Sequence, residues 1–332
     1  MDPGTVAYSE TAMRNLRPLS IGKMLDRAFT ICFKNFVPFL SLVAVVVIPQ
    51  LILSYFSSRD LLSTMNDAFG TLSTGGADTA SPTVLSDKIL QAETNAGPYF
   101  LALSLLGLLF VPLSNAAVVS GVSRAYLGLP VRFAQCYGDA VRRWPALIGL
   151  MLIWLAVVMI AVMTVLIAFF IVGAALGVIA GFLGIVGTIV AVIIGIAAGL
   201  TALLFTFQLY LAAAYSFVTV VLEGSGPIVA CGSGFARVFG AGQFWRSLGI
   251  AASLFGIILG LYLVGAVVGG ITIALTRSFS MEFVVSGLVG AFGYPFLFAV
   301  VAVSYYDVRI RREGFDLQML AAQLGAPASH AP

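Results

Sequence analysis

The feature that most constrains this chain is a 79-residue stretch, residues 144–222, that contains no Asp, Glu, Lys, Arg or His. Water-soluble folds cover their surface with charged and polar side chains, so a stretch of this length is incompatible with them. A run of 18 or more apolar residues is long enough to cross a bilayer as a helix, and this stretch holds at least two such runs. The sequence therefore predicts an integral membrane protein.

The composition of the whole chain indicates the same class. Hydrophobic residues make up 60% of the 332 residues and charged residues 9%, and the mean hydropathy is +1.06. An average soluble domain has about 25% charged residues. Lys and Arg are too sparse, at a net charge of +3, for a nucleic-acid surface. The composition excludes a soluble core and a nucleic-acid partner, and it leaves the lipid bilayer as the first partner.

Hydropathy predicts an all-α, polytopic fold with six transmembrane helices, near residues 36–56, 99–121, 145–172, 188–222, 248–275 and 284–306. The region 145–222 has room for three helices, but basic residues flank it at both ends, so we expect an even number of crossings, namely two. The glycine-rich surplus at 173–187 is then a luminal turn, a re-entrant dip or helix that extends beyond the bilayer.

The distribution of Lys and Arg predicts the orientation. The segments 1–35, 122–144, 223–247 and 307–332 carry 14 basic residues. The outer loops 57–98 and 276–283 carry three, which are Arg59, Lys88 and Arg277. By the positive-inside rule, both termini lie in the cytoplasm. The polar and acidic loop 57–98 is expected to be a solvated linker, with ligand binding as the alternative.

The chain also has an internal repeat, in which a cytoplasmic amphipathic helix precedes a transmembrane hairpin. In the first copy, polar residues such as Lys23 and Thr30 lie on the helical face opposite Leu25 and Cys32. Similar helices are expected at 132–144 and from Gly226-Pro227 onward. They either anchor the hairpins or provide a lipid-sensing or partner-docking surface. The predicted organisation is an N-terminal cytoplasmic segment (1–18), one membrane domain (19–322, with repeats 19–128, 129–225 and 226–322) and a disordered tail (323–332).

Glycines four residues apart mark candidate contacts between helices. Such pairs let helix backbones approach closely in lipid, so we expect intramolecular packing seams, with homodimerisation as the alternative. The pairs are Gly173/Gly177/Gly181, Gly195/Gly199, Gly256/Gly260 and Gly265/Gly269. Pro49, Pro112 and Pro295 lie inside predicted spans, where proline favours kinks.

The spans predicted above contain no ionisable residue, which argues against an ion-coupled transporter. Five polar residues inside them are the candidates for an interhelical hydrogen-bond cluster or for the lining of a cavity. They are Gln50, Asn115, Gln208, Tyr210 and Tyr215.

Catalytic and metal chemistry find no support in the sequence. The only histidine, His330, lies in a Pro/Ala-rich tail, and no phosphate-binding loop or nucleophile elbow is present. Cys32, Cys136 and Cys231 form no CxxC pair, and we expect them to be reduced, small apolar residues. No catalytic, cofactor-binding or metal-binding residue is predicted.

A mixed-charge cluster directly follows the last span. Basic residues alone would suit an anionic lipid surface, but the acidic residues among them suit salt bridges better. We expect the cluster to dock on the amphipathic helices; a positive-inside signal without a partner is the alternative. The cluster comprises Asp307, Arg309, Arg311 and Arg312, and its expected partners are Asp26, Arg27, Asp139 and Arg143.

Three segments carry a resemblance to a known family. They read PLSIGKMLDRAF at 18–29, VLEG at 221–224 and YYDVRIRREGFD at 305–316. Together they resemble the bacterial glycerophosphoryl diester phosphodiesterase membrane-domain family, over residues 18–322. The resemblance implies the membrane fold and a bacterial inner-membrane setting. It does not imply the phosphodiesterase activity, because that activity belongs to a catalytic barrel for which the residues outside the spans leave no room.

We therefore expect a non-catalytic integral membrane protein that acts as a scaffold or accessory subunit, with a membrane protein partner or a second copy of itself. The alternative is a channel or facilitator for a neutral or lipid-like molecule. A cavity lined by the five polar residues would favour the facilitator, whereas a dry bundle packed through glycines would favour the scaffold. A third hypothesis, a membrane-embedded hydrolase, requires a polar catalytic cluster that the sequence lacks.

Overall fold

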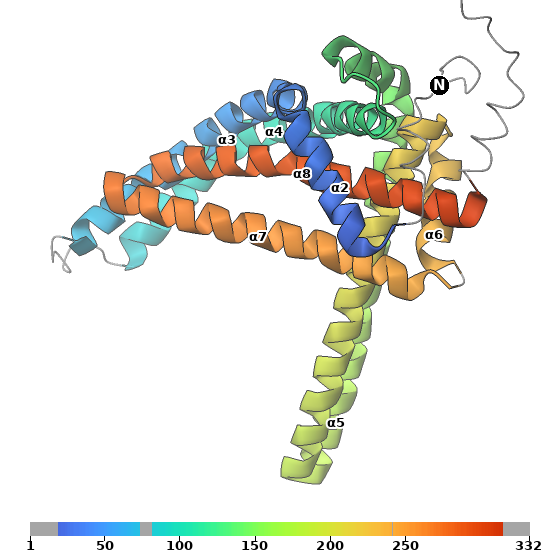
Figure 1. Ribbon diagram of the computed structural model, residues 1–332. Helices are drawn as coiled ribbons and strands as arrows, with labels where there is room; N and C mark the ends of the chain where they lie inside the picture. The colour runs from blue at the N-terminus through green and yellow to red at the C-terminus, as the bar shows by residue number, and fades with distance from the viewer. Residues whose placement is uncertain (1–18, 74–81, 241, 315–332) are drawn as a thin grey trace, which may run out of the picture. The chain divides into compact units, whose positions relative to one another are not determined.

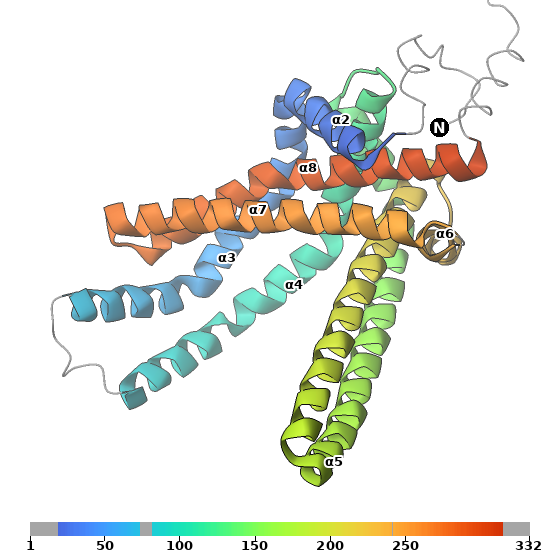
Figure 2. The same ribbon diagram turned by 60° about the horizontal axis from the view of Figure 1, so that its bottom comes forward.

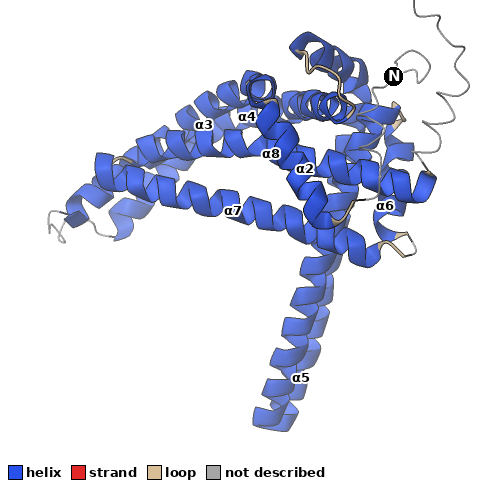
Figure 3. Ribbon diagram, in the orientation of Figure 1, coloured by secondary structure: helices blue, strands red, loops and turns tan. Residues whose placement is uncertain are grey.

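The computed structural model describes residues 19–73, 82–240 and 242–314, and every regular element in these ranges is an α-helix (Figures 1 and 3). The helices are α2 (Ile21–Lys34), α3 (Phe36–Ser73), α4 (Pro82–Tyr126), α5 (Phe133–Glu223), α6 (Pro227–Phe239), α7 (Phe244–Thr276) and α8 (Phe279–Glu313). The predicted segments 1–18 and 323–332 lie outside the described residues.

Six helical segments in the described part are long and apolar enough to cross a membrane, which confirms the predicted multi-pass character. They are Phe36–Gly70, Ser86–Tyr126, Phe133–Val178, Ala180–Glu223, Phe244–Thr276 and Phe279–Glu313. The chain divides into two compact units. One is Pro145–Phe255, and the other combines Asp2–Trp144 with Gly256–Pro332. Helices α5 and α7 each contribute to both units, and the division does not follow the predicted repeat boundaries.

In the unit Pro145–Phe255, α5 is a long helical hairpin (Figure 2). The chain reverses at Gly184, whose φ of 56° and ψ of −131° are accessible only to glycine. Helix continues on both sides of this residue, so the glycine-rich segment is a tight reversal flanked by extended helix. Each uncharged arm is about 57 Å long at 1.5 Å per residue. The most apolar part of the first arm contains no buried residue.

Helix α6 packs closely on the returning arm of α5, within the same unit. Gly234 makes this possible, because a Cβ added there would lie 2.5 Å from the Ala212 carbonyl oxygen and would also meet the Ser216 hydroxyl. Beside this contact, the rings of Trp154 and Phe235 stack with centroids 5.2 Å apart. One glycine and an aromatic pair thus fix the short helix to the hairpin.

In the other unit, α3 and α4 pair as a hairpin, α8 packs against both, and α2 packs on α8 (Figure 1). The expectation of a solvated linker at 57–98 is wrong for the described residues, because α3 continues to Ser73 and α4 begins at Pro82. Leu62 and Ala92 are buried, and Asn95 donates a hydrogen bond to Asp60 Oδ2 (3.0 Å). Contacts of this kind hold the polar segment in two paired helices.

Most of the predicted glycine seams are wrong within this chain. A Cβ added at Gly256, Gly260 or Gly265 would meet no atom within 4 Å, and the same holds for the other predicted seam glycines, which are Gly173, Gly177, Gly181, Gly195 and Gly199. Gly269 is the exception, because an added Cβ would lie 2.9 Å from Glu282 Oε1. Homodimerisation through the open glycines stays a prediction.

Close approach occurs at glycines that the four-residue spacing did not select. At Gly293, on α8, an added Cβ would lie 2.5 Å from Leu261 Cδ1 on α7, and at Gly287 it would collide with Leu51 on α3. Pro49, Pro112 and Pro295 lie inside continuous helices. One turn before Pro112, the Leu109 carbonyl accepts a hydrogen bond from Trp144 Nε1 at 2.8 Å, so a side chain satisfies a carbonyl close to the proline.

The three segments expected to be amphipathic helices take different forms. α2 and α6 are separate helices, whereas 133–144 forms the start of α5. In α2, Met24, Ala28 and Cys32 are buried and the polar residues Lys23 and Lys34 are exposed. α2 therefore has one packed face and one polar face.

The contact at Gly234 generates a prediction. Replacing Gly234 by Ala should lower the free energy of unfolding by about 1–3 kcal/mol, because α6 has to move off α5. Gly232→Ala is the matched control, since a Cβ at Gly232 meets nothing within 4 Å and Ala in a helix is favoured over Gly by about 0.5–1 kcal/mol. Thermal melting in detergent measures both. Equal melting temperatures for the two variants would contradict the packing of α6.

Candidate ligand cavity

A cavity of about 740 Å³ lies among α3, α7 and α8, entirely within the unit that contains these segments. Most of its wall is apolar. Its lining residues are Val47, Gln50, Leu51, Ser54, Ile258, Leu261, Tyr262, Gly265, Ala266, Glu282, Phe283, Ser286, Gly287, Val289, Gly290, Ala291, Tyr294 and Leu297. Small-molecule sites in proteins have volumes of about 300–1,000 Å³ and mostly apolar walls, so size and lining are those of a ligand site.

Two contacts between α7 and α8 bracket the cavity. At one end Gly269 faces Glu282 and Ser286, and at the other Leu261 faces Gly293. Between these contacts, Gly265 and Gly290 line the cavity and have no atom within 4 Å of an added Cβ. Small residues here leave room between two helices that are held together on either side.

Polar side chains are few in this wall, and one of them carries a charge. Ser286 Oγ donates a hydrogen bond to Glu282 Oε1 at 2.8 Å. No described Lys or Arg forms an ion pair with Glu282. An ionised side chain near the centre of a membrane helix costs about 2.5–3.5 kcal/mol, and the cost falls toward the interface. Glu282 falls within the segment 276–283 that was predicted to be an outer loop, but α8 begins at Phe279, so Glu282 lies in the first turn of this helix.

The five polar residues predicted to form a hydrogen-bond cluster or to line a cavity are divided between the two units. Gln50 lines the cavity, whereas Asn115 lies on α4, which contributes no described residue to the cavity wall. The unit Pro145–Phe255 holds the other three. Gln208 is fully buried and donates to the Phe244 carbonyl at 3.0 Å, Tyr215 is buried, and Tyr210 is 52% exposed. Of the five, only Gln50 therefore lines the cavity.

The C-terminal end of α8 is tied to the chain just before α2. Asp307, 1% exposed, accepts a hydrogen bond from the Leu19 amide at 2.7 Å and pairs with Arg311 at 3.0 Å. Arg311 also donates to the Leu19 carbonyl at 3.0 Å. The docking surface is thus backbone, and Arg311 pairs with neither Asp26 nor Asp139, contrary to the prediction.

The other members of the predicted docking set have varied contacts. Arg309 pairs with Glu313 on its own helix at 2.9 Å, and Arg27 lies 5.5 Å from the centre of the Tyr126 ring. Tyr126 in turn stacks on Tyr306. Asp139 accepts a hydrogen bond from Ser120 at 2.9 Å. Arg312 is exposed at the end of α8, and Arg143 is half-buried near the start of α5.

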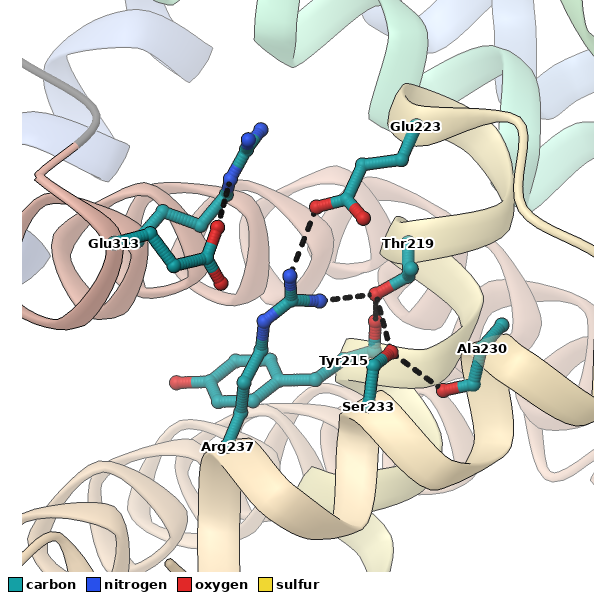
Figure 4. Close-up of polar contacts among 8 residues, drawn as sticks. Tyr215, Thr219, Glu223, Ala230, Ser233, Arg237 and Glu313 are labelled. Atoms are coloured by element: carbon teal, nitrogen blue, oxygen red, sulfur yellow. Dashed lines mark hydrogen bonds and ion pairs between the residues drawn. The ribbon is translucent and has the colours of Figure 1, made fainter. Parts of the chain in front are cut away.

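A buried guanidinium ties α6 to α5 (Figure 4). Arg237 donates to Thr219 Oγ1 at 2.6 Å and pairs with Glu223 at 2.9 Å. Ser233, one turn earlier on α6, donates to the Ala230 carbonyl and lies 3.4 Å from Thr219 Oγ1. A buried charge needs both a counter-charge and hydrogen bonds to offset its desolvation, and Arg237 has both.

Sequence reasoning missed the pattern behind these contacts. The second helix of each hairpin, near its C-terminal end, carries a buried Ser followed three residues later by a buried Ser, Thr or Asp: Ser120/Ser123, Ser216/Thr219 and Ser304/Asp307. In each pair at least one member contacts another segment of its unit, through Asp139, Arg237 or Leu19. The Ser-x-x-polar spacing at the ends of three spans is the signal that could have identified them.

The cysteines are buried or half-buried thiols. Cys32 S–H donates to the Pro295 carbonyl, with a sulfur–oxygen distance of 3.6 Å. Burial raises the pKa of the Cys32 thiol from 9.0 to about 12, and it also raises the pKa of the Cys231 thiol. Both groups stay protonated at neutral pH, which makes them poor nucleophiles. Among residues 19–73, 82–240 and 242–314, no group of three His, Cys, Asp or Glu could hold a metal ion.

The Asp307 contacts generate a second prediction. Asp307→Ala leaves Arg311 without its carboxylate and the Leu19 amide without this acceptor, and it should lower the free energy of unfolding by about 1–3 kcal/mol. Asp26→Ala, at an exposed position of α2, should change it by about 0.5 kcal/mol at most. Thermal unfolding in detergent compares the two. If Asp26→Ala lowers the Tm as much as Asp307→Ala does, the contacts of Asp307 with Leu19 and Arg311 do not stabilise the fold more than an exposed side chain does.

No protein-family model, curated protein or solved structure matches this chain. The resemblance to the phosphodiesterase membrane domains therefore stays a prediction that rests on the three quoted segments. Any functional assignment has to come from the geometry above.

Proposed function

We propose that this chain is a non-catalytic, multi-pass membrane protein that binds a lipid-like molecule in the α3–α7–α8 cavity and acts as a facilitator for it. The observation that carries the proposal is the bracketed cavity, in which Gly265 and Gly290 leave room that no side chain fills. The cavity supports a facilitator for a lipid-like molecule through its mostly apolar wall, which includes Gln50 but not the other four polar residues named from the sequence. The open glycines at 256, 260 and 265 argue against a dry, glycine-packed bundle.

The chemistry of the wall supports a lipid-like ligand. Leu51, Leu261 and Leu297 provide apolar surface, whereas Gln50 and Ser54 provide a few neutral hydrogen-bonding groups. Apolar walls with a small number of convergent polar groups suit a molecule that has chains and a compact head. A small hydrophilic solute would leave most of this wall without a partner.

A scaffold remains the second candidate, because of the α5 hairpin. Its uncharged arms, about 57 Å long, exceed the about 30 Å of hydrocarbon in a bilayer, and tilting by up to about 40° absorbs only part of the excess. A membrane protein partner or a second copy of the chain would cover the remainder. Ligand binding that is insensitive to the cavity variants described below would favour this candidate.

We also propose a bacterial inner membrane as the setting, with both termini in the cytoplasm. A bacterial inner membrane follows from the resemblance, and cytoplasmic termini follow from the distribution of Lys and Arg. The threefold repeat of amphipathic helix and hairpin is supported by a common spacing of buried residues. Met24/Ala28, Cys136/Ala140 and Ala230/Gly234 are pairs of buried residues four positions apart, one in each copy.

The cavity proposal is tested by filling the space at Gly265. Gly265→Leu should lower the affinity for co-purifying lipid about tenfold or more, because the new side chain occupies the cavity. Gly270→Leu is the matched control on α7, since a Cβ there also meets nothing within 4 Å and Gly270 does not line the cavity. Native mass spectrometry after mild detergent extraction counts the retained lipid. Equal retention by wild type and both variants would rule out the cavity as the site.

The orientation is tested by thiol labelling in intact cells. In a variant whose three cysteines are replaced by Ala, Thr276→Cys should react with an impermeant maleimide from outside, and Thr30→Cys should not. Both positions are exposed, so a difference in labelling reports sidedness rather than burial. Labelling at 30 with protection at 276 would invert the proposed topology.

A further inference from the structure

We infer that the cavity takes a cationic amphiphile, in which a protonated amine or quaternary ammonium head pairs with Glu282 and the alkyl chain lies along the apolar wall. This inference rests on the proposed function and adds the charge and chemical class of the ligand. It depends on the Glu282 carboxylate, which forms no ion pair with a described basic residue, on its neighbours Ser286 and Gly269, and on the mostly apolar wall of the cavity.

Among the described residues, the Glu282 carboxylate has one polar partner, the Ser286 hydroxyl, which donates to it at 2.8 Å. An ionised carboxyl group has about four acceptor sites, so a single hydroxyl leaves most of them open. It forms no ion pair with any basic residue that the structure describes. A cation in the cavity would supply the missing counter-charge, and attraction between charges is stronger beside an apolar wall than in water.

The position of Glu282 is held open by its neighbour on α7. An added Cβ at Gly269 would come within 2.9 Å of Glu282 Oε1 and 3.0 Å of Ser286 Oγ. Glycine at 269 therefore lets the Glu282–Ser286 pair lie against the α7 backbone, beside the cavity that both residues line. A carboxylate in the first turn of a helix also gains from the helix dipole, but this gain does not require the cavity.

The rest of the wall selects against other head groups. No Lys, Arg or His in the described part of the chain lines the cavity, so a phosphate, sulfate or carboxylate head would find no counter-charge there and would face Glu282. A neutral alcohol could hydrogen-bond Gln50 or Ser54 but would leave the carboxylate without a counter-charge. Leu51, Ile258 and Leu297 then contact the chain of the amphiphile.

The experiment compares three probes with the same chain: hexadecyltrimethylammonium, hexadecanol and hexadecyl sulfate. Each is radiolabelled, and its saturable binding to the full-length protein in maltoside micelles is measured against protein-free micelles. The variants are Glu282→Gln, the cavity-filling Gly290→Leu, and Glu93→Gln as a charge-matched control at an exposed position of α4. Thermal melting of each variant reports whether it is folded.

We expect wild type to bind the ammonium probe about tenfold or more tightly than the alcohol, since a hydrogen bond or pair to a charged group is worth about that much. Glu282→Gln should remove the preference and leave alcohol binding unchanged, whereas Glu93→Gln should behave as wild type. Gly290→Leu should weaken both probes.

The outcomes separate the inference from the function on which it rests. Equal binding of ammonium and alcohol, both weakened by Gly290→Leu, overturns the cationic class and leaves a lipid cavity. Tighter binding of the sulfate probe also overturns it. Absence of saturable binding for all three probes, or binding that Gly290→Leu leaves unchanged, overturns the proposed function as well. If Glu282→Gln does not fold, Glu282→Asp should retain the ammonium preference in weakened form, and its complete loss in a folded Glu282→Asp would count against the pairing.

Discussion

The structure depends on one constraint: inside hydrocarbon, backbone amides and carbonyls have to find their partners within the protein. Each group left without a partner there costs several kcal/mol, so the chain satisfies them within helices. Contacts between helices then have to come from side chains. The described polar contacts lie mostly near helix ends, where Asp307 binds the Leu19 backbone and Arg237 binds Thr219 and Glu223. The middle of the long α5 hairpin has no such contact and no buried core of its own.

Glycine serves two opposite purposes in this chain. At Gly234, Gly287 and Gly293 it removes a side chain that would collide with a neighbouring helix. At Gly265 and Gly290 it removes a side chain that would otherwise fill a cavity. The two uses look identical in the sequence, because both appear as a small residue in an apolar helix. The two kinds of glycine differ only in whether a neighbouring helix lies close to them. The sequence around a glycine does not show this, because it depends on how the helices pack.

The number of spans and the helical class could be predicted, because hydropathy and helix length follow directly from the bilayer. Helix ends could not, and two errors have this origin. Polar sequence at 57–98 indicated a linker, but paired helices with Leu62 and Ala92 buried continue through most of it. A hydropathy boundary placed Glu282 outside the helix that contains it. A third error has another cause: the partners of Arg311 were sought on the amphipathic helices, whereas Arg311 pairs with Asp307 on its own helix and donates to the Leu19 carbonyl.

The same geometry explains why a cavity and a charged residue occur together. Two helices in contact at a single point can pivot until the gap beside that point closes, whereas contacts on both sides of a gap prevent this. Gly269 and Leu261 provide such contacts on α7, one toward Glu282 and Ser286 and the other toward Gly293. The carboxylate is therefore part of the spacer that keeps the cavity open, and it faces the space that it maintains. An amphiphile that binds there needs to displace no packed side chain, so its affinity depends on how well its head matches Glu282 and its chain matches the apolar wall.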